Sequence, residues 1–279
     1  MKKPTVAIVG LGQIGGSLAG ALTRGRLARV LGVTRRPETA RRARRLGLLA
    51  QAGTDLAAVS EADVVVLATP VRTLLAQIPR VAPLLRPGAL LTDVGSTKAA
   101  VVREMLRWAR RGPAVGGHPM AGSERAGLDG ADPELFRNRP WIFVPASPDA
   151  RRRAGLLERL VREVGARPVW MDDPREHDLA VARVSHVPHL VAYALAEEPD
   201  GAVRVAGNSY RDATRVALAD VEMCLDFLLT NRAAVARAAR EFGRRLAELA
   251  RLVARGEEAA LHRRLVRARL RRSTLLRNG

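Results

Sequence analysis

Residues 5–16 read TVAIVGLGQIGG, and this stretch decides the fold. Its apolar, β-branched start predicts a buried strand, and residues 17–24 after it predict a helix. Between the two, Gly10, Gly12 and Gly15 form a G-x-G-x-x-G pattern. In this context the pattern is typical of dinucleotide binding, because the glycines permit a tight turn, close approach of backbone to a pyrophosphate, and close packing of helix on strand. The start of the helix adds N–H donors for the phosphates.

Buried strands and amphipathic helices alternate through the first part of the chain. The further predicted strands are residues 29–33, 63–68, 89–94, 114–117, 141–144 and 167–171. The further predicted helices are residues 71–85, with breaks near Pro79 and Pro83, 99–110 and 149–164. Strands that are apolar throughout, alternating with helices, predict an α/β fold with a Rossmann-type, doubly wound parallel sheet.

After Asp172 the strand signals stop. The predicted helices of this part are residues 174–197, one beginning near 201, 221–252 and 257–270. We therefore expect a dinucleotide-binding domain at 1–171 and an all-helical substrate and dimerisation domain at 172–279. Helices this long with one apolar stripe indicate packing against a second copy as a homodimer. The arginine-rich residues 263–277 fit a solvated face or the rim of the dimer.

Composition narrows the possible partners of the chain. The net charge of +19 suggests nucleic acid, but all the basic residues except Lys2, Lys3 and Lys98 are arginine, which indicates a compositional bias, and aromatic residues are only 3%. Few rings are available for base stacking, so we expect no nucleic-acid partner. The single cysteine, Cys224, excludes an intrachain disulfide and a cysteine-based metal cluster, and we expect no metal. No signal peptide and no uncharged apolar stretch of about 18 residues is evident, so we expect a cytoplasmic protein with no membrane contact.

The end of the second predicted strand bears on the choice of cofactor. An acidic residue there usually holds the ribose of NAD, whereas this chain has Thr34, Arg35 and Arg36. Two guanidinium groups can grip a 2′-phosphate, so NADP is favoured over NAD, although arginine is common throughout the chain. The predicted cofactor-binding residues are Gly10, Gly12, Gln13, Ile14, Gly15, Thr34, Arg35, Arg36, Thr69 and Pro70.

Two strand ends carry candidate catalytic residues. Ser96 follows the strand at 89–94, and His118 follows two glycines at the end of the next one. A lone histidine in such a turn is more often structural than catalytic. Ligands of open α/β sheets, however, bind outside the carboxyl ends of the strands, where Ser96 and His118 are both expected.

The helical part supplies candidate substrate-binding residues. Ser185 and His189 lie one helical turn apart, and Arg211 and Arg215 belong to a polar stretch in an otherwise apolar region. A hydroxyl and a neutral imidazole beside the cofactor, with an arginine for a carboxylate, suit hydride transfer from a hydroxy acid. We therefore predict His118 and Ser96 as catalytic, and Arg215, His189, Ser185 and Arg211 as substrate-binding.

Over nearly its whole length the chain resembles the prephenate and arogenate dehydrogenases of tyrosine biosynthesis, the TyrA family. The motifs that carry the resemblance are the N-terminal glycine loop, DVGSTK at 93–98, GGHPMAG at 116–122, SHVPH at 185–189 and RDATR at 211–215. The resemblance implies oxidative decarboxylation. His118 would withdraw the proton of the ring 4-hydroxyl, Ser96 would support His118, Arg215 would bind a substrate carboxylate, and His189 would lie near the ring carboxylate.

Departures from the family leave alternatives open. Cys224 stands where many members have tryptophan, so one wall of the substrate pocket is expected to differ. We expect neither a regulatory ACT domain nor a fused chorismate mutase. Prephenate is the favoured substrate because of His189, and arogenate with NADP is the alternative. More distant alternatives are another β-hydroxy acid dehydrogenase or a pyrroline-carboxylate reductase, and a non-enzymatic nucleotide-binding or nucleic-acid-binding protein.

Overall fold

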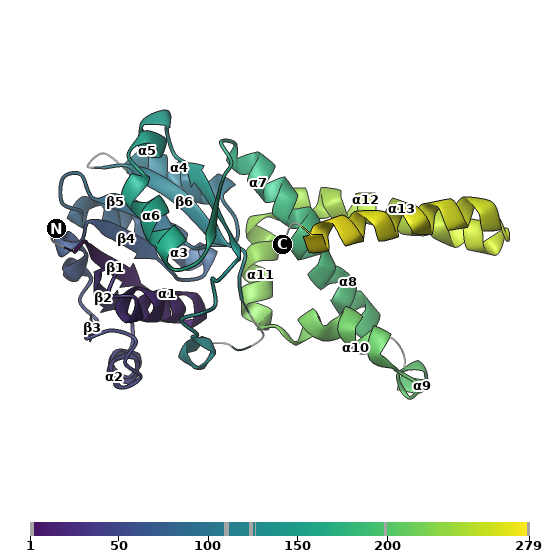
Figure 1. Ribbon diagram of the computed structural model, residues 1–279, viewed down its shortest axis with the longest axis horizontal. Helices are drawn as coiled ribbons and strands as arrows, with labels where there is room; N and C mark the ends of the chain where they lie inside the picture. Colours follow the sequence, from purple (N-terminus) through teal and green to yellow (C-terminus); the bar gives the residue numbers. More distant parts are fainter. Residues whose placement is uncertain (1–2, 109–111, 123–124, 126, 198–199, 278–279) are drawn as a thin grey trace.

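The structure, a computed structural model, describes residues 3–108, 112–122, 125, 127–197 and 200–277. A sheet covered by helices on both faces forms the N-terminal part, and a group of helices projects from one side of it (Figure 1). The fold is therefore a Rossmann-type α/β domain followed by helices, as the sequence predicts.

The sheet has eight strands in the order β3-β2-β1-β4-β5-β6-β7-β8. They are β1 (Thr5–Val9), β2 (Arg29–Val33), β3 (Gln51–Gly53), β4 (Val64–Leu67), β5 (Leu90–Asp93), β6 (Ala114–Pro119), β7 (Pro140–Pro145) and β8 (Arg167–Trp170). The parallel strands β1, β4, β5 and β6 end at one edge, so the glycine turn and His118 come to the same side of the sheet.

Alternate strand residues pack on opposite faces, which is why the strands read as continuous apolar runs. On one face, Val6 and Ile8 share a core with the helices α1 (Gln13–Arg24) and α6 (Gly155–Glu163). On the other face, Ala7 and Val9 pack with α3 (Val71–Val81) and α4 (Ala99–Trp108). The remaining helices of this domain are α2 (Pro37–Arg45) and α5 (Pro148–Arg152).

The sheet differs from the prediction at its two edges. β7 pairs antiparallel with β6, and β8 then follows β7 in parallel, so these last two strands run against the other six. Between β6 and β7 the chain forms a short 3₁₀ turn, Gly127–Gly130, and the antiparallel pairing shows that this link does not make the helical crossover that parallel strands need. The three-residue β3 was not predicted because it contains no apolar run.

Several predicted helices also have different bounds. Pro79 does not break α3, which continues to Val81, whereas the helix does end before Pro83, in a 3₁₀ turn at Ala82–Leu84. The helix predicted at 149–164 is two helices, α5 and α6. Residues 109 and 110, the predicted end of another helix, lie outside the described residues.

All the regular secondary structure that is described after Trp170 is helical. The helices are α7 (Pro174–Val181), a π-helical turn (Ala182–His186), α8 (Val187–Ala196), α9 (Asp200–Val203), α10 (Asn208–Thr214), a 3₁₀ turn (Arg215–Leu218), α11 (Val221–Thr230), α12 (Arg232–Ala254) and α13 (Glu258–Arg277). The helix predicted at 221–252 is split at Asn231, whose buried side chain donates a hydrogen bond of 2.7 Å to the carbonyl oxygen of Asp178. That bond fixes the start of α12 against α7.

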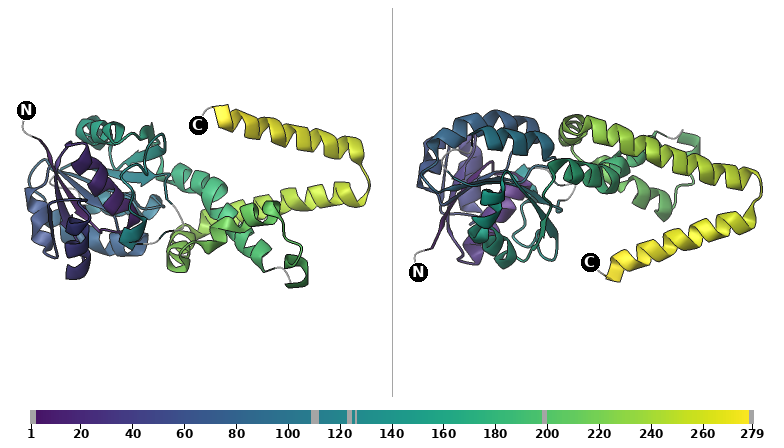
Figure 2. Two further views of the ribbon diagram at one scale, coloured as in Figure 1. Left: turned by 60° about the horizontal axis from the view of Figure 1, so that its bottom comes forward. Right: turned by 90° about the horizontal axis from the view of Figure 1, so that it is seen from above.

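The last two helices face outward. α12 and α13 form an antiparallel hairpin that projects away from the sheet (Figure 2), and large apolar side chains such as Leu246 and Leu270 are exposed on it.

The continuous helix Pro174–Ala196 is long and apolar enough to cross a membrane by length and composition alone, with a mean hydropathy of 1.3. Its first turns contact the sheet domain through buried polar side chains, so this likeness is weak evidence for a membrane.

Candidate active site

The glycine turn after β1 has the shape of an anion cradle. Gly10 has a φ of 104°, and a Cβ there would lie 2.5 Å from the carbonyl oxygen of Ala68. A Cβ at Gly15 would lie 2.0 Å from the carbonyl oxygen of Gly10, so α1 packs on β1 only because these residues are glycine. Gly12, in contrast, faces open space, and α1 begins at Gln13 without a side-chain cap. The uncapped N–H groups and the open space fit the pyrophosphate of a dinucleotide.

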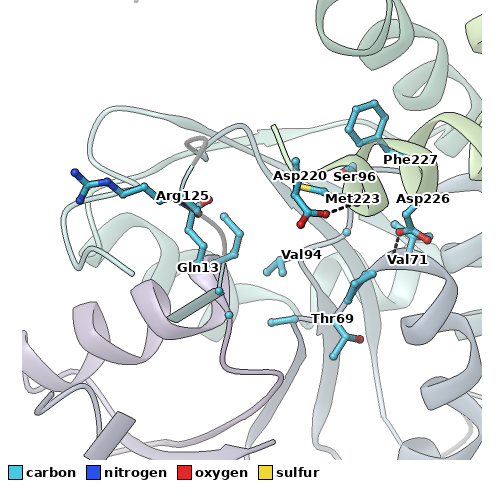
Figure 3. Close-up of a pocket in the computed structure, with 16 residues that line it drawn as sticks. Gln13, Thr69, Val71, Val94, Ser96, Arg125, Asp220, Met223, Asp226 and Phe227 are labelled. Atoms are coloured by element: carbon cyan, nitrogen blue, oxygen red, sulfur yellow. Dashed lines mark hydrogen bonds between the residues drawn. The ribbon is translucent and has the colours of Figure 1, made fainter. Parts of the chain in front are cut away.

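A cavity of about 280 Å³ lies beside this turn (Figure 3). From the sheet domain it is lined by Gly12, Gln13, Ile14, Thr69, Pro70 and Ser96, among others. From the helical part it is lined by Asp220, Met223, Asp226 and Phe227. The cavity therefore lies between the carboxyl ends of the sheet strands and α11, and six of the predicted site residues share it.

The predicted 2′-phosphate residues lie at the end of β2, the strand next to β1. The N–H of Thr34 donates to the carbonyl oxygen of Gly53, 3.0 Å away, which holds the turn against β3. Arg35 and Arg36 are exposed, and Arg36 directly precedes α2. Two exposed guanidinium groups thus stand at the same edge of the sheet as the glycine turn.

His118 is buried near the end of β6, with 7% of its surface exposed. Its Nδ1 lies 3.0 Å from Nε2 of His177, on α7. Within the described part of the structure its side chain bonds to His177 and not to Ser96, which lines the cavity. Burial, and then the charges of His177 and Lys98, hold the pKa of His118 well below its ordinary value. His118 is therefore an uncharged imidazole at neutral pH and can accept a proton.

The two glycines before His118 allow β6 to lie unusually close to its neighbours. A Cβ at Gly117 would be 2.3 Å from the carbonyl oxygen of Asp93, and one at Gly116 would be 2.9 Å from the Lys98 side chain. The N–H of Gly117 donates to Oδ1 of Asp93, 3.0 Å away, and Oδ2 of Asp93 bonds to the Lys98 ammonium. Burial raises the pKa of Asp93 and lowers that of Lys98, while their mutual attraction opposes both shifts. This fully buried pair fixes the position of the strand that carries His118.

Four of the five histidines gather around this point. His186, at the end of the π-helical turn after α7, stacks on Phe227 with ring centroids 4.5 Å apart, and burial lowers its pKa to about 4. His189 approaches the same phenylalanine edge-on at 5.2 Å. Among the described residues, no group of three or more histidine, cysteine or acidic side chains has a geometry that could hold a metal ion.

Two carboxylates of the helical part cap helices of the sheet domain. Asp178, on α7, accepts hydrogen bonds from the N–H groups of Lys98 at 2.6 Å and Ala99 at 2.9 Å, at the start of α4. Asp226, on α11, accepts from the N–H groups of Val71 and Arg72 at the start of α3, and from the Arg72 side chain. A carboxylate at a helix N-terminus satisfies otherwise unpaired N–H groups and favours the helix dipole. Both contacts join the helical part to the sheet domain, and the one between Asp226 and Val71 lies in the wall of the cavity.

The structure brings only some of the predicted substrate-binding residues close together. His189 Nδ1 lies 2.9 Å from the carbonyl oxygen of Ser185, one turn earlier, so the Nδ1–H donates there. Ser185 is partly exposed, whereas Arg211 and Arg215 are exposed on α10 and the following 3₁₀ turn. Neither arginine lines the cavity. Cys224 also does not line it: the thiol is buried near Tyr193 and raises the pKa of that phenol to about 12.

The residues that sequence reasoning did not single out are His177, Asp178 and Asp226. His177 and Asp178 belong to a run of four polar residues, 175–178, at the start of α7, so residue type alone does not set them apart. Asp226, in contrast, lies in the apolar run of α11, and an acidic residue in such a run is the signal that could have found it.

Both parts of the chain match family models. Residues 18–170 match the prephenate dehydrogenase nucleotide-binding domain, and residues 173–267 match the prephenate dehydrogenase dimerization domain. The chain is 35% identical to a prephenate dehydrogenase of Bacillus subtilis over 243 residues, which is 82% of this chain and 65% of that protein. The chain thus spans about two thirds of the length of this relative.

Solved structures are similar over the whole chain. Prephenate dehydrogenase from A. aeolicus, in complex with hydroxyphenyl propionate and NAD+, is 30% identical with a TM-score of 0.89, and the match covers 99% of each chain. Synechocystis arogenate dehydrogenase is 31% identical with a TM-score of 0.81, over 97% of this chain and 99% of the other. A 3-hydroxyisobutyrate dehydrogenase of Mycobacterium tuberculosis, 19% identical with a TM-score of 0.55 over 76% of this chain and 69% of that one, shares the fold alone.

Proposed function

The chain belongs to the prephenate dehydrogenase family, and from that premise we propose that it converts prephenate oxidatively to 4-hydroxyphenylpyruvate and carbon dioxide. The observation that carries this proposal is His118, a buried and uncharged imidazole. It does not line the cavity, but it lies near the end of β6, at the edge of the sheet that also bears the glycine turn, and Ser96 after the neighbouring strand β5 does line the cavity. A neutral base at the same sheet edge as a dinucleotide cradle suits the oxidation of an alcohol.

The proposed chemistry needs one base and a carboxylate that leaves. His118 accepts the proton of the ring 4-hydroxyl as the hydride departs from the same carbon, and later returns that proton to the phenolate oxygen. The bond from the ring to its carboxylate breaks, carbon dioxide leaves, and the bonding electrons complete the aromatic ring. The bound dinucleotide supplies the hydride acceptor. Ser96, which lines the cavity next to the glycine turn, is placed to orient the hydroxyl.

The remaining substrate contacts are proposed from residues around α8. Arg215 would bind the side-chain carboxylate bidentately, with Arg211 one turn earlier adding positive charge. His189 would lie near the ring carboxylate, and the turn that begins at Ser185 orients it. Because both arginines are exposed, a substrate carboxylate can reach them without prior desolvation of a buried charge.

The cofactor is proposed to be NADP in preference to NAD. The support is the pair of exposed guanidinium groups of Arg35 and Arg36 at the end of β2, where an NAD-specific site usually has a carboxylate. The coarser assignment, a nicotinamide dinucleotide at the glycine turn, rests on the open space at Gly12 and the uncapped start of α1.

Arogenate is a second candidate substrate. The likeness to Synechocystis arogenate dehydrogenase covers 97% of this chain, and arogenate has the same ring and hydroxyl as prephenate. The two compounds differ only in a keto or amino group on the side chain, which His118 does not contact in the proposed chemistry.

We also propose a homodimer formed by the helical part, in the cytoplasm, with no nucleic-acid or membrane partner. The support for the dimer is the projecting hairpin of α12 and α13, which exposes Leu246, Val253, Leu265 and Leu270. Apolar side chains on a hairpin that stands apart from the sheet domain fit burial against a second copy.

A two-by-two assay tests this proposal. Purified protein is mixed with prephenate or arogenate and with NAD or NADP, and reduced cofactor is measured together with released carbon dioxide. We expect turnover of prephenate with NADP above the other pairs. Turnover of arogenate above prephenate would favour the second candidate, and no turnover of either, with oxidation of a short β-hydroxy acid, would refute the proposal.

A further inference from the structure

Three buried side chains form a hydrogen-bonded line that ends at His118. Nδ1 of His118 lies 3.0 Å from Nε2 of His177, and Nδ1 of His177 lies 2.8 Å from Oδ1 of Asp178. His118, His177 and Asp178 are exposed by 7%, 0% and 5%, so water does not compete for these contacts. The inference below rests on the proposed role of His118 as the base.

The line has one consistent assignment of protons. The Asp178 carboxylate accepts hydrogen bonds from two backbone N–H groups and acts only as an acceptor, so Nδ1 of His177 is the donor to it. Neutral His177 then has a lone pair on Nε2, which must accept from Nδ1–H of His118. His118 is left with a lone pair on Nε2, the nitrogen that is free to take a proton from a substrate hydroxyl.

The far end of the line is anchored on two sides. The N–H groups of Lys98 and Ala99, at the start of α4, fix both carboxylate oxygens of Asp178, and Asn231 donates to its backbone carbonyl at 2.7 Å. Asp178 therefore has no freedom to rotate away from His177. Since Asp178 and His177 lie on α7 and His118 lies on β6, the helical part of the chain sets the proton arrangement of a sheet residue.

We infer that His177 and Asp178 are positioning residues, which hold His118 as the Nδ1–H tautomer and stabilise the imidazolium that forms when Nε2 accepts the hydroxyl proton. Without the acceptor at His177, His118 would revert to the Nε2–H tautomer that histidine prefers in water, and its substrate-facing nitrogen would carry a proton already. The charge of the imidazolium is shared along the line toward Asp178, in the way that a buried carboxylate supports a catalytic histidine in other enzymes.

The tautomer is tested directly by nitrogen NMR on protein labelled with ¹⁵N in its histidines, without substrate. His118→Asn assigns the signals, and His262→Gln, at an exposed histidine on α13, is the matched control. We expect Nδ1 of His118 to be protonated and Nε2 to be bare in the wild type and in the control. A proton on Nε2 of His118 in the wild type would overturn the inference, and this readout does not depend on which substrate the enzyme uses.

Kinetics then test the effect on catalysis, with whichever substrate and cofactor the wild type turns over. We expect His177→Leu to lower kcat by about 10- to 100-fold with KM changed less than about 3-fold, because only the base is affected. His177→Gln, whose amide oxygen can accept from Nδ1–H of His118, is expected within about 5-fold of the wild type. Equal loss in both variants, or loss in neither, would contradict the inference.

A double variant separates positioning from general damage. If His177 acts through His118, then His118→Asn with His177→Leu is no slower than His118→Asn alone. Additive losses would show that His177 acts by another route. If the wild type turns over neither prephenate nor arogenate, the proposed function fails, while the NMR result still decides the tautomer.

Discussion

Gly117→Ala tests whether close packing of β6 on β5 places His118. The added Cβ would lie 2.3 Å from the carbonyl oxygen of Asp93 and 3.1 Å from both Thr92 Oγ1 and Trp141 Nε1. The two strands would have to separate by roughly 1 Å to restore ordinary contact.

The cost follows from two effects. Forcing an extra methyl group into a packed core costs about 1–3 kcal/mol. The same shift weakens the hydrogen bond from the Gly117 N–H to Asp93, which is 3.0 Å long, and a bond to a charged group is worth about 1.5–3 kcal/mol. We therefore expect Gly117→Ala to lower the free energy of unfolding by about 3–5 kcal/mol. Since His118 moves with the strand, kcat/KM should fall by about 100-fold or more.

Urea unfolding followed by tryptophan fluorescence measures the change in the free energy of unfolding, because Trp108, Trp141 and Trp170 all belong to the sheet domain. Gly155→Ala is the control: Gly155 lies on the surface in α6 with no heavy atom within 4 Å of a Cβ position, so the free energy of unfolding should stay the same or rise by up to about 1 kcal/mol. A Gly117→Ala variant that is as stable and active as the control would refute the reasoning.

Three further variants test other parts of the site. Replacing Arg35 and Arg36 together by alanine should weaken NADP binding by roughly 10- to 100-fold and leave NAD unchanged; titration calorimetry with both cofactors decides, and equal losses would remove the 2′-phosphate role. Asp226→Ala should lower the free energy of unfolding by about 1–3 kcal/mol, because two N–H groups of α3 lose their cap; a stability equal to the wild type in urea would exclude that role. Arg215→Ala should raise the substrate KM by the equivalent of about 1.5–3 kcal/mol with little change in kcat, and an unchanged KM would place Arg215 outside the site.

The sequence predicts the parts of the structure that depend on local pattern. The glycine turn, the apolar strands and the edge at which His118 lies all follow from residue type and spacing along a short segment. The direction of β7 does not, because burial makes a strand apolar whichever way it runs. Pairing with β6 decides that direction, and it leaves no periodic signal in the sequence.

The sequence also does not predict the contacts between the sheet domain and the helical part. Asp178 caps α4 across 80 positions of sequence, and Asp226 caps α3 across 155. Asp178 stands in a run of polar residues, 175–178, and Asp226 stands in an apolar run, and in neither case does the sequence indicate which helix the carboxylate caps. Similarly, His177 gains its significance only from its 3.0 Å approach to His118. Long-range contacts of single residues become evident only when the fold is known.

The most direct test of the central claim compares wild type and His118→Asn with prephenate and NADP. Reduced cofactor and carbon dioxide are measured in the same reaction, at saturating concentrations of both ligands. We expect equal amounts of the two products from the wild type, and a kcat about 10²- to 10⁴-fold lower in the variant with KM little changed. Turnover by His118→Asn at the wild-type rate, or reduced cofactor without carbon dioxide, would contradict oxidative decarboxylation with His118 as its base.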